Sequence, residues 1–182
     1  FQASNHSLSK GVDPVSHLFS LLLFCGCTAV GFGRYWQLRR RETLLEQGVW
    51  VLARWRVLLS SQNLSTRRLF SALSQDSQCR GLTFLPELEQ GFSTPDPNGF
   101  WVERLHHFCQ STGQDRQCWT GMELALSRLG GSSTEQQLDL LDKAAALQQE
   151  AHHQAKALLV QQGKLSGTLG VLLGAGLGVF FW

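Results

Sequence analysis

The sequence of 182 residues lacks the short motifs that mark the common enzyme classes. It contains no GxxxxGK[ST] phosphate-binding loop, no G-x-S-x-G nucleophile turn and no HExxH zinc motif. The usual signatures of phosphate binding, acyl transfer and zinc hydrolysis are therefore missing, and we expect no catalytic residue and no cofactor. No segment of more than a few residues alternates apolar and polar side chains as a strand would, so the sequence predicts an all-α protein.

Cysteine is sparse and its spacing gives no framework for disulfides or metals. The five cysteines are an odd number without a CxxC pair. Cys79, Cys109 and Cys118 lie in the part that we predict to be cytoplasmic, where thiols stay reduced. His106 and His107 could be combined with Cys109 and Cys118 into a metal site. Adjacent residues, however, point about 100° apart on a helix, and we therefore expect no metal.

Charged side chains are absent from the last part of the chain. Leu165 to Trp182 contains only uncharged residues. As a helix, this stretch covers roughly 27 Å, close to the ~30 Å hydrocarbon core of a bilayer. In lipid the backbone must satisfy its own hydrogen bonds, so a helix is favoured despite the many glycines. We predict a transmembrane helix at residues 165–182, with Gly170, Gly174 and Gly178 forming a groove for helix packing. A buried, glycine-rich helix of a soluble core is the alternative.

A second stretch near the start of the chain is also almost uncharged. Between Asp13 and Arg34 the only ionisable side chain other than cysteine is one histidine, and an aromatic pair typical of a membrane interface follows at residues 35–36. The sequence predicts an extracytoplasmic tail at residues 1–15 and a transmembrane helix at residues 16–36. A cleaved signal peptide is the alternative, although the basic cluster follows the apolar run instead of preceding it. The chain begins with phenylalanine, as a processed or truncated product would.

The distribution of charge predicts the orientation in the membrane. Fifteen of the sixteen basic residues and thirteen of the fourteen acidic ones lie from Arg34 to Lys164, which gives this part a net charge of +2. The positive-inside rule places it in the cytoplasm and both termini across the membrane. Its charges are too balanced for a nucleic-acid-binding surface. We therefore expect contact with membrane lipid and none with nucleic acid.

The central part, residues 37–164, is predicted to form a cytoplasmic helical bundle. Apolar residues recur at helical spacing in residues 38–60, 64–73, 82–92, 100–109 and 119–129. Two prolines and an Asn-Gly pair predict a loop from Ser93 to Gly99. His152 and His153 lie among glutamine and alanine, which favours a solvated face of the last helix.

The last predicted helix of the bundle has the most regular pattern. Its apolar stripe consists of Leu140, Ala144, Leu147, Ala151, Ala155 and Leu158. Ser132, Ser133 or Thr134 can cap its start, with Glu135 and Gln136 placed for a capping box. Because no proline interrupts the pattern, we predict one helix of more than forty residues that continues into the terminal span. A coiled coil with a partner strand is the alternative.

Two elements late in the chain, LGGSSTEQQLDLLDKA and GKLSGTLGVLLGAGLG, carry a family resemblance. The first element is matched by Leu129, Gly130, Ser132 and Gln137. The second is matched by Lys164, Leu169, Gly170, Leu172 and Gly174. With the order of spans and helices, these residues make the chain similar to the stage III sporulation protein AB family of endospore-forming bacteria over about residues 18–182. Ser133 stands where that family usually has aspartate.

The resemblance implies a function that the amino-acid composition alone does not indicate. The family is similar to the cytoplasmic helical domains of inner-membrane platform proteins in type II secretion and type IV pilus machines. A non-enzymatic membrane component of the channel complex between mother cell and forespore is implied, acting as a platform in the outer forespore membrane on the mother-cell side. The implied partners are a secretion-type ATPase, other channel subunits and, as an alternative, a second copy of the chain. A membrane-anchored helical adaptor or signalling module unrelated to sporulation is the competing interpretation, and gene neighbourhood distinguishes the two.

Overall fold

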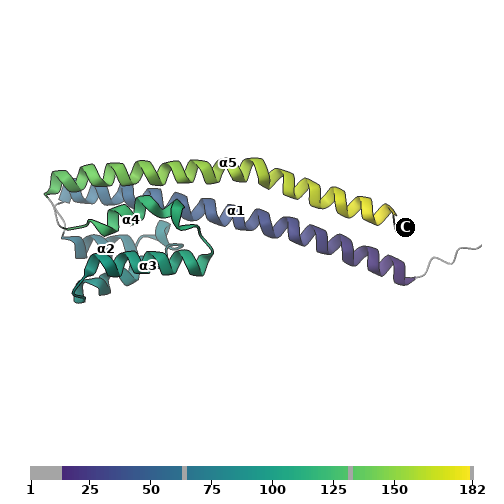
Figure 1. The fold of residues 1–182 in the computed structure, drawn as a ribbon, viewed down its shortest axis with the longest axis horizontal. Coiled ribbons are helices and arrows are strands. Elements are labelled where there is room, and N and C mark those ends of the chain that lie inside the picture. The colour runs from purple at the N-terminus through teal and green to yellow at the C-terminus, as the bar shows by residue number, and fades with distance from the viewer. Residues whose placement is uncertain (1–13, 63–64, 131–132, 181–182) are drawn as a thin grey trace, which may run out of the picture. The chain divides into compact units, whose positions relative to one another are not determined.

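The structure is a computed structural model that describes residues 14–62, 65–130 and 133–180. Within the first and last helices, the side chains of most residues in 14–27 and 163–180 are not described. All regular structure in the described residues is helical, with no strand (Figure 1). The predicted all-α fold is therefore confirmed.

Five α-helices and three short 3₁₀ segments follow one another in the described residues. They are α1 (Pro14–Gln62), α2 (Thr66–Ser74), η1 (Ser77–Cys79), η2 (Leu85–Ser93), α3 (Pro97–Thr112), η3 (Arg116–Trp119), α4 (Thr120–Ser127) and α5 (Thr134–Phe180). The first and last helices are continuous over 49 and 47 residues. The prediction of one helix of more than forty residues is confirmed for the last, while the first joins two segments that were predicted separately. The predicted helix at residues 82–92 is a 3₁₀ segment instead.

The predicted loop from Ser93 to Gly99 is wrong in its second half, because α3 begins at Pro97. The side chain of Asp96 accepts a hydrogen bond from the Gly99 N–H at 3.0 Å, so Asp96 caps the helix. Proline suits the first helical position, where the N–H has no intrahelical partner. The Asp-Pro pair, a common turn signal, is here the start of a helix.

Two compact units make up the chain. One is Gln37–Val160, and the other combines Phe1–Trp36 with Gln161–Trp182. The first unit can be compared with the helical domain predicted at residues 37–164. The assignment of these ranges to cytoplasm and membrane stays a prediction.

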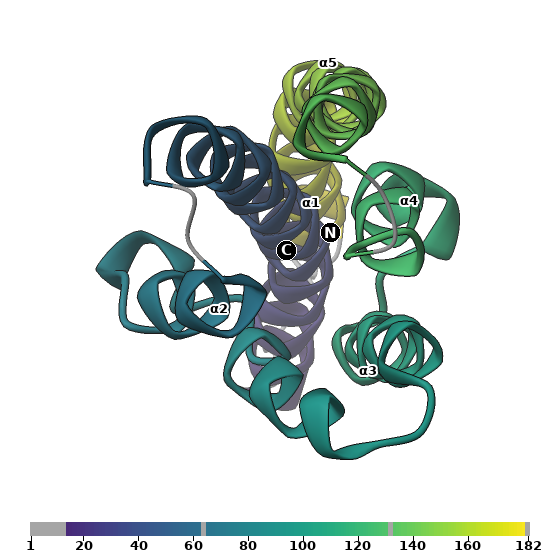
Figure 2. The same cartoon turned by 90° about the vertical axis from the view of Figure 1, so that its left-hand side faces the viewer.

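Within the unit of residues 37–160, α1 and α5 run antiparallel. Three pairs mark their alignment: Glu42 with His152, Gly48 with Gln148, and Arg56 with Asp142. The helices α4, α3 and α2 follow around the unit from α5 back to α1 (Figure 2). Two long helices thus form one side of the bundle, and shorter helices close the other.

Aromatic side chains join the short helices to α1. The ring of Phe70 on α2 lies 5.5 Å from that of Trp55 and 5.1 Å from that of Trp101 between centroids. Both contacts are edge-to-face, an arrangement worth about 0.5–1.5 kcal/mol beyond burial. Phe108 and Trp119 make a second such contact at 5.4 Å. These rings are buried, so α2, α3 and η3 share one core with α1.

The predicted apolar stripe of α5 is confirmed in part. Ala144 and Ala155 are buried and Leu140, Ala151 and Leu158 are half-buried, but Leu147 is 46% exposed. Next to it, Gln148 is fully buried, so its amide, and not an aliphatic side chain, lies between α5 and its neighbours at this level. Because α1 and α4 cover this face within the same chain, no partner strand is needed to bury it.

The capping box predicted at the start of α5 is confirmed. The Ser133 N–H donates to Oε1 of Gln136 at 3.3 Å, and the Gln136 N–H donates to Oγ of Ser133 at 3.4 Å. Each side chain satisfies a backbone donor that the first turn of a helix leaves free. Ser133 therefore serves as the N-cap of α5.

We expect Ser133→Ala to lower the free energy of unfolding of the unit of residues 37–160 by roughly 0.5–2 kcal/mol. The cause is the loss of the acceptor for the Gln136 N–H. Thr134→Ala is the matched control, because Thr134 is exposed and is the first residue of the helix, after the cap. Urea denaturation measures both variants, and equal midpoints for Ser133→Ala and wild type would contradict the cap.

The second unit carries exposed aromatic side chains on α1. Trp36 is 61% exposed and Tyr35 36%, and both rings lie next to Phe32, with centroids 6.2 and 6.4 Å away. Among the described residues, no helix is long and apolar enough to cross a membrane. The transmembrane helices predicted at residues 16–36 and 165–182 thus gain no support from the structure, although most of their side chains lie outside the described set.

Candidate functional site

The turn between α4 and α5 builds the most distinctive surface of the unit of residues 37–160. Leu129 is buried in the core, which fixes the chain directly after α4. Gly130 follows with a φ of 84°, in the left-handed region that favours glycine. Gly130 thus redirects the chain directly after α4, and the side chain of Arg128, at the end of α4, lies on the surface.

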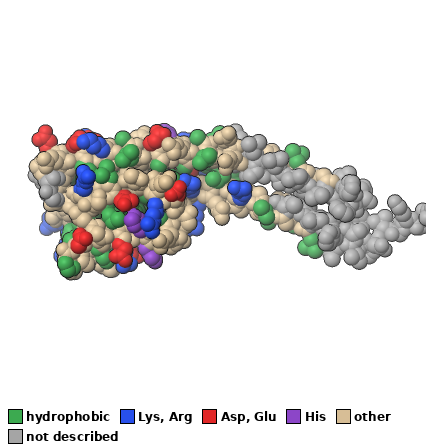
Figure 3. Space-filling model, viewed as in Figure 1, with side chains coloured by type: hydrophobic (Ala, Val, Ile, Leu, Met, Phe, Trp, Pro, Cys, Tyr) green, Lys and Arg blue, Asp and Glu red, His purple; other side chains and the backbone are tan. Residues whose placement is uncertain are grey.

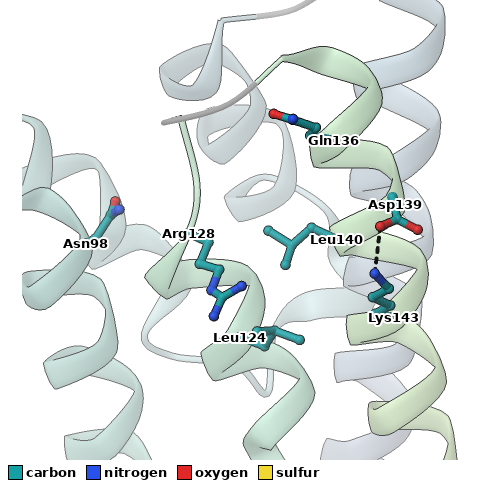
Figure 4. Close-up of a pocket in the computed structure, with 7 residues that line it drawn as sticks. All are labelled: Asn98, Leu124, Arg128, Gln136, Asp139, Leu140 and Lys143. Carbon is teal, nitrogen blue, oxygen red and sulfur yellow. Dashed lines mark hydrogen bonds and ion pairs between the residues drawn. The ribbon is translucent and has the colours of Figure 1, made fainter.

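A cleft of about 470 Å³ opens beside this turn. Its lining consists of Asn98, Leu124, Arg128, Gln136, Asp139, Leu140 and Lys143. Figure 4 shows these side chains on three neighbouring helices, with Asn98 on α3, two residues on or directly after α4 and four on α5. Nδ2 of Asn98 donates to the Ser127 carbonyl at 3.1 Å, which ties the start of α3 to the end of α4. The walls of the cleft are therefore set by helices and not by a free loop.

The basic side chains in this cleft outnumber the acidic one. Nζ of Lys143 lies 2.7 Å from a carboxylate oxygen of Asp139, so these two charges offset each other. Arg128 is exposed and forms no ion pair with any carboxylate in the described residues. Leu124 and Leu140 are half-buried and provide apolar surface next to it. The lining residues thus carry a net charge of +1, beside aliphatic side chains.

Gln148 forms a buried polar junction between α5 and the start of α4. Its Oε1 accepts a hydrogen bond from the Met122 N–H at 3.3 Å, and its Nε2 donates to the Cys118 carbonyl at 3.2 Å. Trp119, at the N-cap of α4, has no side-chain acceptor to offer. A residue of another helix therefore supplies the cap that the sequence of α4 lacks. Gly121 allows the approach, because a Cβ there would lie 2.8 Å from the Gln148 N.

A second cleft, of about 390 Å³, lies between η3 and α5. Nη2 of Arg41 donates to Sγ of Cys118 at 2.8 Å on its wall, and the exposed Leu147 also contributes to the lining. The neighbouring Glu42 lies 3.4 Å from Nε2 of His152, and both side chains are about 15% exposed or less. The expectation of a solvated face is thus wrong for His152, whose ring faces Glu42 on α1, whereas His153 is exposed as expected.

Two of the three thiols of this unit are protected. Cys79 and Cys109 are buried, and burial raises the pKa of each thiol to about 11. The charge of Asp76 adds to the increase for Cys79. Cys118 is partly exposed, so it is the thiol of this unit that reagents can reach.

His106 and His107, the two histidines considered as metal ligands, have different surroundings in the structure. Nε2 of His106 lies 3.3 Å from a carboxylate oxygen of Glu123, and His107 is exposed. Across the described ranges, no three His, Cys, Asp or Glu side chains are grouped to hold a metal ion.

The structure describes only some of the residues that belong to the two family elements. Leu129 and Gly130 form the turn beside the first cleft, and Gln137 lies in the first turns of α5. Ser132 lies outside the described residues, as do the side chains of Lys164 and Leu169. The same holds for the environment of Gly170, Gly174 and Gly178, so the packing groove stays a prediction.

Sequence reasoning missed Arg128, Asn98 and Gln148. Asn98 belongs to an Asn-Gly pair that indicates a turn, and Arg128 contributes only to the net charge. Gln148 interrupts the apolar pattern and so gives no periodic signal. The close approach of two glycines, Gly48 and Gly121, to its side chain shows that it is buried, and only the fold brings them together.

Acidic and basic side chains are interspersed over the described part of the visible face, without a region of one sign (Figure 3).

The geometry defines a small all-α protein built on two long helices, antiparallel within the unit of residues 37–160, with clefts on its surface. The chain belongs to the stage III sporulation protein AB family, whose sequence model matches residues 17–182. This confirms the resemblance seen in the two sequence elements. No curated protein and no solved structure matches the chain. Membership in this family implies a role in sporulation.

Proposed function

We propose that this chain is a non-enzymatic membrane component of the stage III channel complex between mother cell and forespore. In this proposal it acts as a platform next to a secretion-type ATPase. The unit of residues 37–160 lies in the mother-cell cytoplasm, and the segments around it anchor the chain in the outer forespore membrane. Membrane lipid, the ATPase, other channel subunits and a second copy of the chain are its partners.

The observation that carries the proposal is the extent of the family match. It covers residues 17–182 and so includes both uncharged stretches as well as the helical unit. An unrelated adaptor or signalling module would not share this whole arrangement with a sporulation family. The family is not a known enzyme family, which supports a binding role over a catalytic one.

The helices suit a component that transmits position. Both α1 and α5 continue without a break from the unit of residues 37–160 into the other unit. Contacts such as Glu42 with His152 and Arg56 with Asp142 hold the two helices together at several levels. Within the unit of residues 37–160, a displacement applied by a cytoplasmic motor would therefore move the two helices as a pair.

Deletion of the gene tests the proposed role. We expect the deletion strain to lose heat-resistant spores and the full chain to restore them, with the tagged protein in the membrane fraction of sporulating cells. Normal spore numbers in the deletion strain would contradict the role in the channel complex. Recovery of the chain in the soluble fraction would contradict the membrane anchor.

Cys118 provides a test of the proposed orientation. In a chain whose Cys25 and Cys27 are replaced by serine, we expect a membrane-impermeant maleimide to label Cys118 only after permeabilisation. Cys79 and Cys109 should react slowly even then, because they are buried and burial raises the pKa of both thiols to about 11.

The matched control for this experiment is Ser9→Cys, in the tail predicted to lie outside the cytoplasm. It should be labelled in intact cells. Labelling of Cys118 in intact cells, with Ser9→Cys protected, would reverse the orientation.

A further inference from the structure

We infer that the cleft beside the α4–α5 turn docks an amphipathic helix of a cytoplasmic partner protein, with a carboxylate on Arg128 and an aliphatic side chain on Leu124 and Leu140. This inference rests on the proposed function, because it assumes a platform that binds a protein in the cytoplasm. It adds the surface and the chemistry of the bound segment.

The charge of the cleft indicates which charge the bound segment of the partner carries. Arg128 is exposed and forms no ion pair among the described residues, whereas Lys143 is already paired with Asp139 at 2.7 Å. A planar guanidinium can bind a carboxylate through two parallel hydrogen bonds, which gives both strength and direction. An acidic side chain is therefore the complement of the one unpaired charge in the lining.

The spacing of the lining residues selects a helix. Leu124 and Arg128 are four residues apart, so they lie one turn apart along the same face of the chain at the end of α4 (Figure 4). Leu140 and Lys143 have a similar spacing on α5. An incoming helix with an acidic and an aliphatic residue three or four positions apart can contact the pair on α4 and the pair on α5 at the same time. The half-buried leucines bury more surface when such a helix occupies the cleft.

The composition of the cleft favours a protein over a lipid. Its lining contains two basic side chains and one carboxylate, so its net charge is only +1. Recognition of anionic lipid headgroups depends on clusters of about four or more basic residues, and this lining contains no such cluster. One unpaired guanidinium beside two aliphatic side chains suits a protein segment instead.

The wall of the cleft is rigid enough for a defined docking geometry. Asn98 fixes the start of α3 to the end of α4 through its bond to the Ser127 carbonyl. On the other side, the capping box of Ser133 and Gln136 fixes the start of α5. Both sides are thus held before a partner arrives, which reduces the loss of conformational entropy on binding.

A photocrosslinking amino acid in place of Leu140, in the full chain expressed in sporulating cells, tests this inference. We expect a crosslink to one protein, at a segment in which an acidic residue lies three or four positions from an aliphatic one. Arg128→Glu should lower the crosslinking yield about tenfold, because a carboxylate would then face a carboxylate, and tenfold corresponds to about 1.4 kcal/mol. Arg68→Glu on α2 is the matched control, with the same change of charge at an exposed position outside the cleft.

Charge exchange separates binding from misfolding. Replacing the acidic residue of the mapped segment with arginine should restore the crosslink in the Arg128→Glu chain. The inference would be overturned by an unchanged yield in Arg128→Glu, by an equal loss in Arg68→Glu, or by failure of the exchange to restore the crosslink. It would also be overturned by a crosslink to lipid or to a second copy, by a segment without an acidic residue, or by no crosslink at all. If spores still form and the chain stays in the membrane fraction, such a result removes the docking site but leaves the proposed function standing.

Discussion

Replacing Gln148 with alanine should lower the free energy of unfolding of the unit of residues 37–160 by about 2–4 kcal/mol. The side chain is fully buried and bridges the Met122 N–H and the Cys118 carbonyl. Without it, the buried Met122 N–H and the partly buried Cys118 carbonyl both lose this partner, and a cavity remains between α5 and α4. The start of α4 then has no cap, because Trp119 supplies none.

Two comparisons identify the source of this loss. Gln149→Ala removes the same side chain one position along, where it is exposed, and should change stability by no more than about 0.5 kcal/mol. Gln148→Met keeps most of the volume but removes the hydrogen bonds, and should cost about 1–3 kcal/mol. Urea denaturation measures all three variants. If Gln148→Ala and Gln149→Ala unfold at the same midpoint, the junction does not stabilise the bundle.

Gly121→Ala should destabilise the same unit by about 1–3 kcal/mol, although alanine favours helices. A Cβ at this position would clash with the carbonyl oxygen of Ala144 and lie 2.8 Å from the Gln148 N. Both are backbone atoms of α5, so relief requires the two helices to move apart. That movement would also lengthen the hydrogen bond between Gln148 and the Met122 N–H.

Gly48→Ala is the matched control on the opposite side of Gln148. A Cβ there would meet only side-chain atoms, of Trp119 at 3.1 Å and of Gln148 at 3.2 Å. Side chains can shift by a few tenths of an ångström, and the gain in helix propensity of up to ~1 kcal/mol offsets part of the strain. We therefore expect a smaller loss than for Gly121→Ala. A larger loss for Gly48→Ala would show that α5 rests more tightly on α1 than on α4.

Much of the fold could be predicted because it depends on local signals. The uninterrupted pattern in α5 predicted one long helix, and the run of Ser132, Ser133 and Thr134 before it marked its start, where Ser133 and Gln136 form the capping box. Asp96 shows the limit of local reasoning, since an Asp-Pro pair can open a turn or cap a helix. The choice between them depends on the residues after the pair, and in this chain those residues form α3.

The features that could not be predicted from the sequence depend on contacts between segments that lie far apart along the chain. The burial of Gln148 depends on partners at residues 118 and 122, which lie far from it in sequence. A polar residue beside an apolar stripe indicates a solvated position until a neighbouring helix supplies its hydrogen bonds. Arg128 likewise gave no signal, because an unpaired charge is recognised only when its surroundings are known.

The family assignment had a different basis. It depended on short elements such as Leu129-Gly130 and the glycine-rich tail, of which the first has a clear structural reason. Leu129 anchors the turn, and Gly130 adopts the positive φ that the turn requires. The tail lies among residues whose side chains are not described, so its part in helix packing rests on sequence alone.

Purification of the tagged full chain from the membrane fraction of sporulating cells, followed by quantification of the secretion-type ATPase bound to it, tests the proposed function most directly. The account predicts that the ATPase is retained on the chain in an amount that salt and washing do not remove, and that it is absent from a purification with an unrelated tagged membrane protein. Recovery of the chain from membranes without the ATPase, while both proteins are present in the cells, would contradict a platform next to that motor.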